Sequence, residues 1–437
     1  MLPALLRNSI AGLLLSLLFA GGMWFYVRRV LVPYQRTDAA VHGRPRGNLS
    51  DLYPRWLGAR ELLLRHRDPY SQAITREIQS GYYGRPLDLA RASDPKDEEG
   101  FAYPVYVVFL LAPAIKLPFA IVQAGFLWIL LILTAASVPL WLRAIGYRPH
   151  FPTIAILMIL TLGSFPVAQG VELQQLSLVV NALIAGCLVL IASGYLWFAG
   201  IVLAIATIKP HLALPLVGWL GLWALSNWKE RKKLIYAFGL TMIVLVIAGE
   251  LALPGWIGRF MNAVVAYRQY TRAMSILEVL TTEFVGRILV AIVIIAVVHR
   301  CWKVRREASD TVSFALATSL VLAATIVIAP TIAPYNQLLL LPGILLLAGS
   351  QSILSSKNLS TRILFIIAAI TIFWPWIAAL GLTVASFILP ASRVQQAWAI
   401  PFYTSIAIPL AVLALLFQYA FQILRSGEQT KFASERS

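Results

Sequence analysis

The sequence predicts an all-α integral membrane protein built as a bundle of about twelve transmembrane helices. Hydrophobic residues make up 59% of its 437 positions and charged residues only 13%, against about 25% charged residues in soluble domains. The hydrophobic residues form runs of roughly 20, which is the length that a helix needs to cross a bilayer. Helices also satisfy their backbone hydrogen bonds internally, as lipid requires.

The twelve predicted segments follow from hydropathy along the chain. They are 9–30, 101–118, 119–142, 151–168, 175–193, 195–226, 233–253, 282–300, 311–330, 335–354, 361–388 and 399–424. We interpret the first as an uncleaved transmembrane helix, because its apolar run is long and no small-x-small cleavage site follows it. The remaining organisation is a first outer loop at 33–100, a helical bundle at 101–424 and a short cytoplasmic tail at 425–437.

Clusters of basic residues orient the segments. Lysine and arginine crowd two short loops, 229–233 and 303–306, and such loops face the cytoplasm. Alternating from them places both termini in the cytoplasm and the loop that carries Asp51 on the outer side.

Two arrangements of the early segments remain open. Segment 101–118 contains three prolines, so it is either a short span or a re-entrant hairpin. In the second case, segment 195–226 crosses twice and turns at 209–211, and the termini stay inside.

The first outer loop contains a predicted interfacial helix. Leu52, Trp56, Ala59 and Leu63 recur at helical spacing and form one narrow apolar stripe. Such a helix is expected to lie in the membrane surface with this stripe facing the lipid.

The net charge of +17 arises from 36 basic and 19 acidic residues. Much of the basic charge lies in short loops beside the headgroups, so anionic lipids rather than nucleic acid are the expected partners. The two cysteines, Cys187 and Cys301, lie in or at the end of apolar segments and suggest neither a disulfide framework nor a metal site.

Asp51 is the first candidate for chemistry. It lies just beyond the first segment, where a carboxylate can take a proton from an acceptor hydroxyl as a lipid-linked donor approaches from the bilayer. The alternative is that Asp51 only caps the helix that follows, with Pro54 in the first turn.

Lys209 is the second candidate, since the 36 residues before it, 173–208, and the nineteen after it, 210–228, are uncharged. A lysine beside a helix-breaking proline can bind a phosphate as a point charge. Alternatively, its side chain extends to the membrane interface.

Further polar residues occur at predicted segment ends. Arg268 and Arg272 lie in the outer segment 256–282, and arginine suits a phosphate group, although interfacial helices carry such residues anyway. Glu172, His211, Tyr335 and Asn336 are candidates for contacts to the hydroxyl groups of a substrate. Alternatively, Glu172 is a solvated loop residue, and Tyr335 and Asn336 cap the segment that they open. Because the sequence has no glycine-rich nucleotide loop, zinc motif or nucleophile elbow, we expect no cofactor and no metal.

Several short motifs together resemble glycosyltransferase family 87. They are Asp51 early in the outer loop, WLGARELL at 56–63, RDPY at 67–70, FAYPV at 101–105, LAP at 111–113, Gln174-Gln175, Lys209-Pro210 and Pro334-Tyr335. The sequence departs from the family pattern at Val105, where a second proline is usual. It also departs at Gly170 and Gln174-Gln175, which are separated where glycine and glutamine usually adjoin.

The resemblance implies a GT-C-type membrane enzyme related to polyprenyl-phosphate-mannose-dependent mannosyltransferases. Such an enzyme transfers a sugar from a polyprenyl phosphate to a lipid or glycan hydroxyl on the outer face, with inversion at the anomeric carbon. The family's catalytic acid maps onto Asp51, and Lys209, Arg268 and Arg272 are then expected to contact the donor phosphate.

Two other classes of function stay open from the sequence. A transporter or flippase for a lipid-linked or anionic solute could use Lys209 and the arginines for binding, although we see no inverted repeat. A membrane scaffold without catalysis is the third possibility, and it predicts that no single polar substitution abolishes function.

Overall fold

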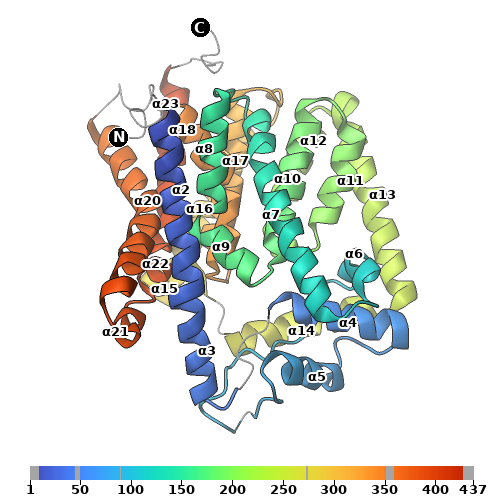
Figure 1. Ribbon diagram of the computed structural model, residues 1–437. Coiled ribbons are helices and arrows are strands. Elements are labelled where there is room, and N and C mark those ends of the chain that lie inside the picture. The colour runs from blue at the N-terminus through green and yellow to red at the C-terminus, as the bar shows by residue number, and fades with distance from the viewer. Residues whose placement is uncertain (1–8, 45–49, 89, 272–273, 351–358, 427–437) are drawn as a thin grey trace.

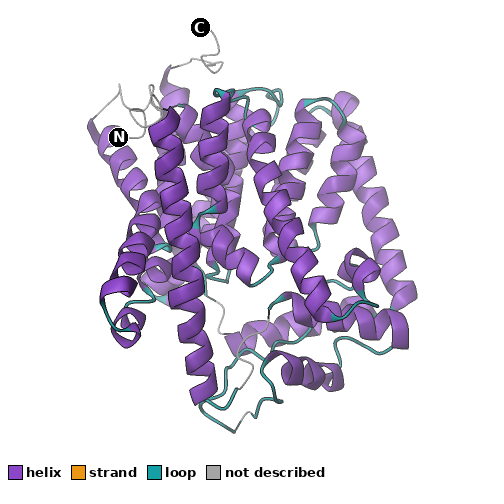
Figure 2. Ribbon diagram, viewed as in Figure 1, coloured by secondary structure: helices purple, strands orange, loops and turns teal. Residues whose placement is uncertain are grey.

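The computed structural model describes residues 9–44, 50–88, 90–271, 274–350 and 359–426. Within these ranges every regular element is a helix and no strand occurs (Figure 2). Six helices are long and apolar enough to cross a membrane, and the number is seven if the bent pair α8 (Phe151–Leu162) and α9 (Phe165–Glu172), which meet at 53°, forms one span. The prediction of an all-α membrane protein is therefore confirmed.

The long helices and their continuous extensions are α2 (Ser9–Tyr26) with η1 (Val27–Leu31) and α3 (Val32–Val41), α7 (Phe119–Ala144), α13 (Trp228–Ala252), α16 (Glu283–Val304), α20 (Leu359–Ile388), and α21 (Ala391–Gln396) with α22 (Ile400–Thr404) and α23 (Ala407–Ser426). Shorter apolar helices are α10 (Leu176–Ala192), α11 (Leu196–Ala206), α12 (Pro210–Ser226), α17 (Val312–Ile328), and η3 (Pro334–Leu340) with α18 (Leu341–Gly349). The others are α4 (Leu52–Arg65), α5 (Gln72–Tyr82), α6 (Val107–Leu111), η2 (Ala112–Ala114), α14 (Trp256–Thr271) and α15 (Ile276–Leu280).

Segment 101–118 does not form a spanning helix. Its only α-helix is α6, with five residues, which at 1.5 Å per residue reaches less than 10 Å of a hydrocarbon core about 30 Å thick. The prolines explain this: Pro104 precedes α6, Pro113 lies in η2, and Pro118 is the N-cap of α7. Of the two arrangements predicted for this segment, the short transmembrane span is therefore wrong.

Segment 195–226 forms two helices, α11 and α12, rather than one. Thr207, Ile208 and Lys209 separate them, and Pro210 occupies the first turn of α12, where its missing amide proton is not needed. This agrees with the arrangement in which the chain turns at 209–211.

The first helix continues beyond its predicted end at residue 30. A π-helical turn, η1, leads into α3, which ends at Val41. Pro33 lies in the first turn of α3 and so does not interrupt the helix. The outer loop predicted from residue 33 therefore begins about three helical turns later in the structure.

The helices pack side by side around α10 and α17 (Figure 1). Most residues of α10 and nearly all of α17 are buried, as expected for helices that are apolar on every face. α14 lies across the lower ends of the long helices in Figure 1, close to α4 and α5. We call this end, with α4, α5 and α14, the loop end.

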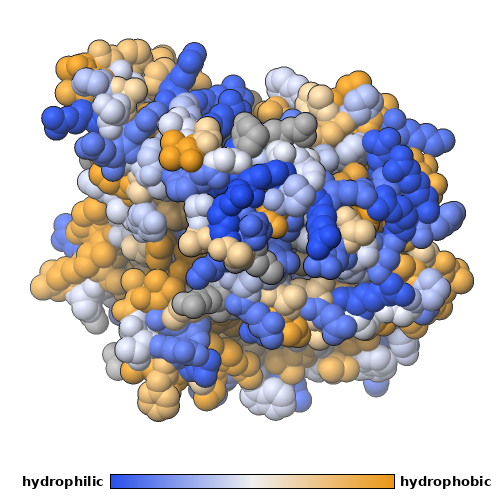
Figure 3. All heavy atoms as spheres, turned by 90° about the horizontal axis from the view of Figure 1, so that it is seen from below, coloured by the Kyte–Doolittle hydropathy of each residue, from blue (hydrophilic) through white to orange (hydrophobic). Residues whose placement is uncertain are grey.

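The apolar stripe of α4 faces protein, not lipid. Leu52, Trp56 and Ala59 are buried, and the Trp56 indole Nε1 donates a hydrogen bond to the carbonyl of Ala114 at 3.2 Å. The α6–η2 segment fills the position where lipid was expected, so the predicted interfacial orientation is corrected. Seen from below, hydrophilic residues gather near the middle of the loop end (Figure 3).

The two basic loops meet at the opposite end. The guanidinium of Arg231 donates to the carbonyls of Arg305 at 3.1 Å and Glu307 at 3.0 Å, and it stacks 4.0 Å from the centroid of Trp223. Because α12 runs from Lys209 to this junction, Lys209 and the basic loops lie at opposite ends of the same helix.

Candidate active site

Asp51 is held in place from both its backbone and its side chain. Its amide donates to the carbonyl of Leu173 at 2.9 Å, and its own carbonyl accepts a hydrogen bond from Arg55. The carboxylate accepts from the Tyr82 hydroxyl at 3.1 Å and from Nε2 of Gln175.

Asp51 is the N-cap residue of α4 by position only. Its side chain makes no capping hydrogen bond to α4, a helix that the structure describes throughout. The carboxylate is instead directed at the turn between α9 and α10. The capping interpretation of this residue is therefore wrong, and Asp51 is available for another role.

Lys209 lies at the break between α11 and α12, with 4% of its surface exposed. Its ammonium donates to Oε1 of Gln175 at 2.8 Å and to the hydroxyl of Ser177 at 2.6 Å, and lies 5.1 Å from the ring centroid of Tyr335. No acidic side chain of a described residue pairs with it. A buried ammonium with neutral partners alone is costly, and an anionic ligand would compensate its charge.

A continuous set of hydrogen bonds joins these groups. Tyr82 donates to Asp51, Gln175 donates to Asp51 and accepts from Lys209, Lys209 donates to Ser177, and Ser177 donates to Oδ1 of Asn336 at 2.6 Å. We call the six residues Tyr82, Asp51, Gln175, Lys209, Ser177 and Asn336 the polar chain. Its members come from five separate regions of the sequence, one of which is α5 with Tyr82.

The ring of Tyr335 lies beside the ammonium of Lys209. A methyl group on Gly170 would lie 3.1 Å from Cβ of Tyr335 and 2.5 Å from Cδ1 of Leu178. Such a contact is shorter than ordinary packing allows, so glycine at 170 lets α9 approach η3 closely. This approach fixes Tyr335 over the lysine.

Three other predicted site residues that the structure describes make no hydrogen bond to the polar chain, although the charge of Lys209 acts on His211. Glu172 ends α9 and is half-buried, whereas His211 on α12 and Arg268 on α14 are exposed. None of these three side chains makes a hydrogen bond or ion pair with a described residue. Arg272 lies outside the described residues.

Sequence reasoning missed three members of the polar chain. The role of Gln175 was left open, and Ser177 and Tyr82 were not considered. Gln175 and Ser177 are polar residues at the start of an apolar helix, which is a usable signal. Tyr82 has no such signal, because its relation to Asp51 depends on the folding of the loop.

Acidic residues surround the loop side of Asp51. Burial, together with the charges of Asp97 and Asp51, raises the pKa of Glu99 well above its usual value. Burial also raises the pKa of Asp97. Tyr82 remains a neutral phenol, since burial and the neighbouring Glu99 and Asp51 raise its pKa well above 10.

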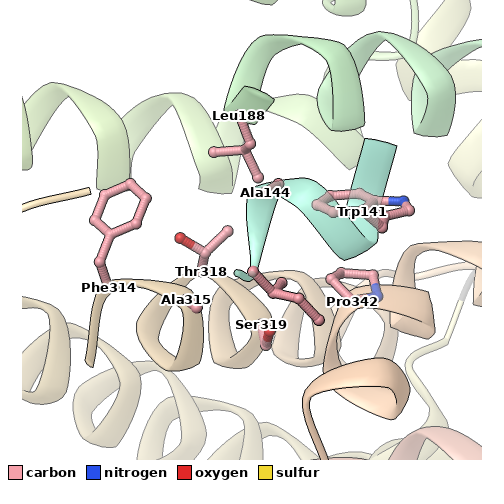
Figure 4. A pocket seen from close by; sticks show the side chains of 9 residues that line it. Trp141, Ala144, Leu188, Phe314, Ala315, Thr318, Ser319 and Pro342 are labelled. Carbon is pink, nitrogen blue, oxygen red and sulfur yellow. The ribbon is translucent and has the colours of Figure 1, made fainter. Parts of the chain in front are cut away.

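A small cavity elsewhere does not belong to this site. It has a volume of about 10 Å³ and is lined by residues that include Trp141, Leu188, Phe314, Thr318 and Ser319 (Figure 4). This is room for about one water molecule. The hydroxyl of Ser319 has no hydrogen-bond partner in the described part of the chain, so a water there would satisfy it.

The polar chain has the elements of a group-transfer site: a fixed carboxylate, a buried cation that forms no ion pair with a described residue, and hydrogen-bonding side chains between them. Among the residues from 9 to 426 that the structure describes, no three His, Cys, Asp or Glu side chains form a group suited to a metal ion. In general a carboxylate such as that of Asp51 can accept a proton, and an ammonium such as that of Lys209 can stabilise a negative charge.

Comparison with known proteins gives the family. No curated protein matches the sequence. The model of glycosyltransferase family 87 matches residues 101–330, a stretch that includes Gln175, Ser177 and Lys209. Because this match covers more than half of the 437 residues, the chain belongs to glycosyltransferase family 87 and is a membrane glycosyltransferase.

Proposed function

We propose that the protein transfers a sugar, mannose, from a polyprenyl phosphate to a hydroxyl of a lipid or glycan, with inversion and with Asp51 as the general base. One observation carries the proposal: Asp51 and Lys209 bind the two ends of the same amide, that of Gln175. A base and a buried cation are thereby held at a fixed separation, as a displacement with an anionic leaving group requires.

The position of Lys209 supports a lipid-linked donor. It lies between two apolar helices, so an anion that reaches it passes along apolar surface. A phosphate attached to a polyprenyl chain has both the charge and the solubility for this route. A soluble nucleotide sugar would need a phosphate-binding domain, for which the sequence shows no motif.

The basic loops support an outer location. By the positive-inside rule the junction of Arg231 with residues 305–307 is cytoplasmic, and the polar chain lies at the other end of α12. In this proposal the six long helices, the bent pair and the five shorter apolar helices each cross once. The chain then crosses twelve times, with both termini in the cytoplasm and anionic lipids beside the basic loops.

The proposed reaction is a single displacement. Asp51 removes the proton from the acceptor hydroxyl as the acceptor oxygen bonds to the anomeric carbon, and the bond from that carbon to the phosphate oxygen breaks. The electron pair leaves with polyprenyl phosphate, whose increased negative charge Lys209 stabilises. Asn336 and Tyr335, next to Lys209, are proposed to contact the sugar.

The test compares the wild type with Asp51→Asn in membranes or in purified form, using radiolabelled polyprenyl-phosphate mannose and a lipid extract as the acceptor pool. We expect transfer by the wild type and a loss of at least about 10²-fold in the variant, the usual contribution of a positioned base. The control is Asp310→Asn, the same change at an exposed position between α16 and α17.

Each outcome is informative. Sugar transfer that survives in a folded Asp51→Asn variant would exclude Asp51 as the general base. If the wild type transfers no sugar but moves the lipid-linked donor across vesicle membranes, the transporter alternative would replace it.

A further inference from the structure

Arg55 lies one helical turn after Asp51 and reaches back to it. Residues four positions apart lie on the same side of a helix, and the guanidinium of Arg55 donates a hydrogen bond to the backbone carbonyl of Asp51. The carboxylate of Asp51 accepts from Gln175, which in turn accepts from Lys209. Two cations, Arg55 and Lys209, are thus joined to one aspartate, the first through its backbone and the second through its side chain.

The ring of Tyr103 holds the guanidinium of Arg55 from one face. Cζ of Arg55 lies 4.5 Å from the centroid of this ring. Tyr103 is itself buried, and its carbonyl accepts a hydrogen bond from the Tyr70 hydroxyl at 2.6 Å. A guanidinium stacked on a ring keeps its N–H groups at its edge, where they can bind the oxygens of a phosphate. It has five such N–H groups, which is more than the Asp51 carbonyl can accept from.

Neither cation has an acidic partner. Among the described residues, no ion pair contains Arg55 or Lys209. The charges of Asp97 and Glu99 act on the same region, but neither side chain pairs with Arg55. Both cations therefore remain able to bind an anionic ligand.

The charges of the groups in contact favour a phosphate as this ligand. Asp51 carries one negative charge, and Arg55 and Lys209 together carry two positive charges. A phosphate diester, such as a polyprenyl-phosphate sugar, adds one negative charge, so the sum is zero. After the displacement Asp51 is protonated and the phosphate monoester carries up to about two negative charges, so the sum is again zero. With Lys209 as the single cation the sum would be negative throughout, which is costly in a site shielded from water.

We propose that Arg55 is a second phosphate-binding residue of this site. Its guanidinium edge binds the donor phosphate together with Lys209, and it stabilises the negative charge that polyprenyl phosphate gains as it leaves. This inference rests on the proposed function and adds a residue that selects a phosphorylated lipid over a neutral one.

Binding of polyprenyl phosphate to the purified full-length protein tests this contact without sugar transfer. The Kd, obtained from thermal unfolding over a range of lipid concentrations, should increase about 10- to 100-fold in Arg55→Gln, the effect of one hydrogen bond between charged groups. Arg55→Lys keeps the charge but lacks the planar fork, so its Kd should lie between those of the wild type and Arg55→Gln. Neutral polyprenol should bind the wild type and Arg55→Gln equally.

A second ligand separates lost charge from disturbed folding. The monomethyl ester of polyprenyl phosphate has the same chain but carries only one negative charge. Because the additional charge of polyprenyl phosphate also interacts with Arg55, Arg55→Gln should lose more affinity for polyprenyl phosphate than for the ester. A general disturbance of the site would weaken both ligands by the same factor.

Arg60→Gln is the matched control, since it makes the same change in the same helix. The guanidinium of Arg60 lies 5.3 Å from the ring centroid of Trp56, so this arginine also stacks on an aromatic ring, but it makes no hydrogen bond to Asp51, which is a described residue. This variant should keep the wild-type Kd for both phosphorylated lipids.

The outcomes distinguish this proposal from the function on which it rests. An unchanged Kd in Arg55→Gln, equal losses for the two phosphorylated lipids, or a wild type that binds polyprenyl phosphate no better than polyprenol would each overturn the role of Arg55. Sugar transfer by the wild type together with any of these results would reject the phosphate contact alone. An Arg55-dependent Kd in a protein that transfers no sugar would support the contact and reject the proposed function.

Discussion

Asp51 and Lys209 bind opposite ends of one side-chain amide. Nε2 of Gln175 donates to Asp51, and Oε1 accepts from Lys209 at 2.8 Å. The amide therefore orients a carboxylate and an ammonium at once without bringing them into an ion pair. Because a direct ion pair would occupy both groups, this arrangement leaves each of them able to meet a substrate.

The first prediction concerns this amide. Gln175→Leu keeps the side-chain volume but removes both hydrogen bonds, so Asp51 and Lys209 lose their common partner. We expect kcat/KM for sugar transfer to decrease about 10- to 100-fold, which corresponds to about 1.4 to 2.8 kcal/mol, or one to two hydrogen bonds to charged groups.

The control for this variant is Gln169→Leu. Gln169 is also buried, but it lies in α9 and makes no hydrogen bond to Asp51 or Lys209, both described residues. Equal losses in the two variants would show that apolar substitution in this region, rather than the shared amide, reduces activity.

The second prediction concerns the charge of Lys209. Lys209→Met removes a buried cation that lacks a counter-ion, so the thermal stability of the free protein should stay the same or increase. Polyprenyl phosphate should stabilise the wild type by about 2.7 kcal/mol at a concentration 100 times Kd. It should give no such stabilisation in the variant.

Thermal unfolding with and without polyprenyl phosphate measures both effects. Lys303→Met is the control, because it removes an exposed lysine at the other end of the molecule. Undiminished protection of Lys209→Met by the lipid phosphate would exclude Lys209 as the phosphate contact.

Hydropathy and isolated charges predicted a large part of this architecture. Asp51 stood out because it follows the first predicted segment in the outer loop, and Lys209 because it is a charge between two long uncharged runs. Both lie in the polar chain. The break at Lys209-Pro210 was recognisable because proline favours a helix start. These are local signals, and local signals are what a single sequence contains.

What the sequence could not predict depends on contacts between distant segments. The Asp51 carboxylate meets Gln175 at a separation of 124 positions and Tyr82 at a separation of 31. The stripe on α4 looked like a lipid-facing surface because periodicity does not reveal whether protein or lipid covers an apolar face. Segment 101–118 likewise had the hydropathy of a span, and only its prolines indicated otherwise.

The third prediction uses two glycines. Gly170→Ala would place a methyl group 2.5 Å from Leu178 and 3.1 Å from Tyr335, so α9 and η3 must separate. We expect a destabilisation of about 1 to 3 kcal/mol and an increased KM for the donor, because Tyr335 moves away from Lys209.

Gly186→Ala is the matched control, as no described heavy atom lies within 4 Å of the new methyl group. It should be neutral or stabilising by up to about 1 kcal/mol, since alanine favours a helix interior. Thermal unfolding and donor titration compare the two. Similar behaviour of both variants would contradict the close approach of α9 and η3.

The fourth prediction is the effect of acid on the loop end. The guanidinium of Arg85 pairs with both carboxylate oxygens of Asp94, and the Asp88 amide donates to Asp94 at 2.9 Å. Arg85 also donates to the carbonyl of Gly43 at 3.0 Å, so the pair fixes Arg85 and Asp94 to the end of the first helix. The Arg85 guanidinium holds the pKa of Asp94 well below its usual range.

The direction in which acid changes the stability follows from this lowered pKa of Asp94. A carboxyl group with a lower pKa in the folded state contributes its full stability above the unfolded pKa, about 3.9, and loses it as the pH decreases toward the folded value. The difference in thermal stability between the wild type and Asp94→Asn should therefore be constant above about pH 5 and decrease below about pH 4. Asp88→Asn, an exposed change in the same loop, should show no such difference. A wild type whose advantage over Asp94→Asn stays constant to pH 3 would show that this ion pair does not stabilise the loop end.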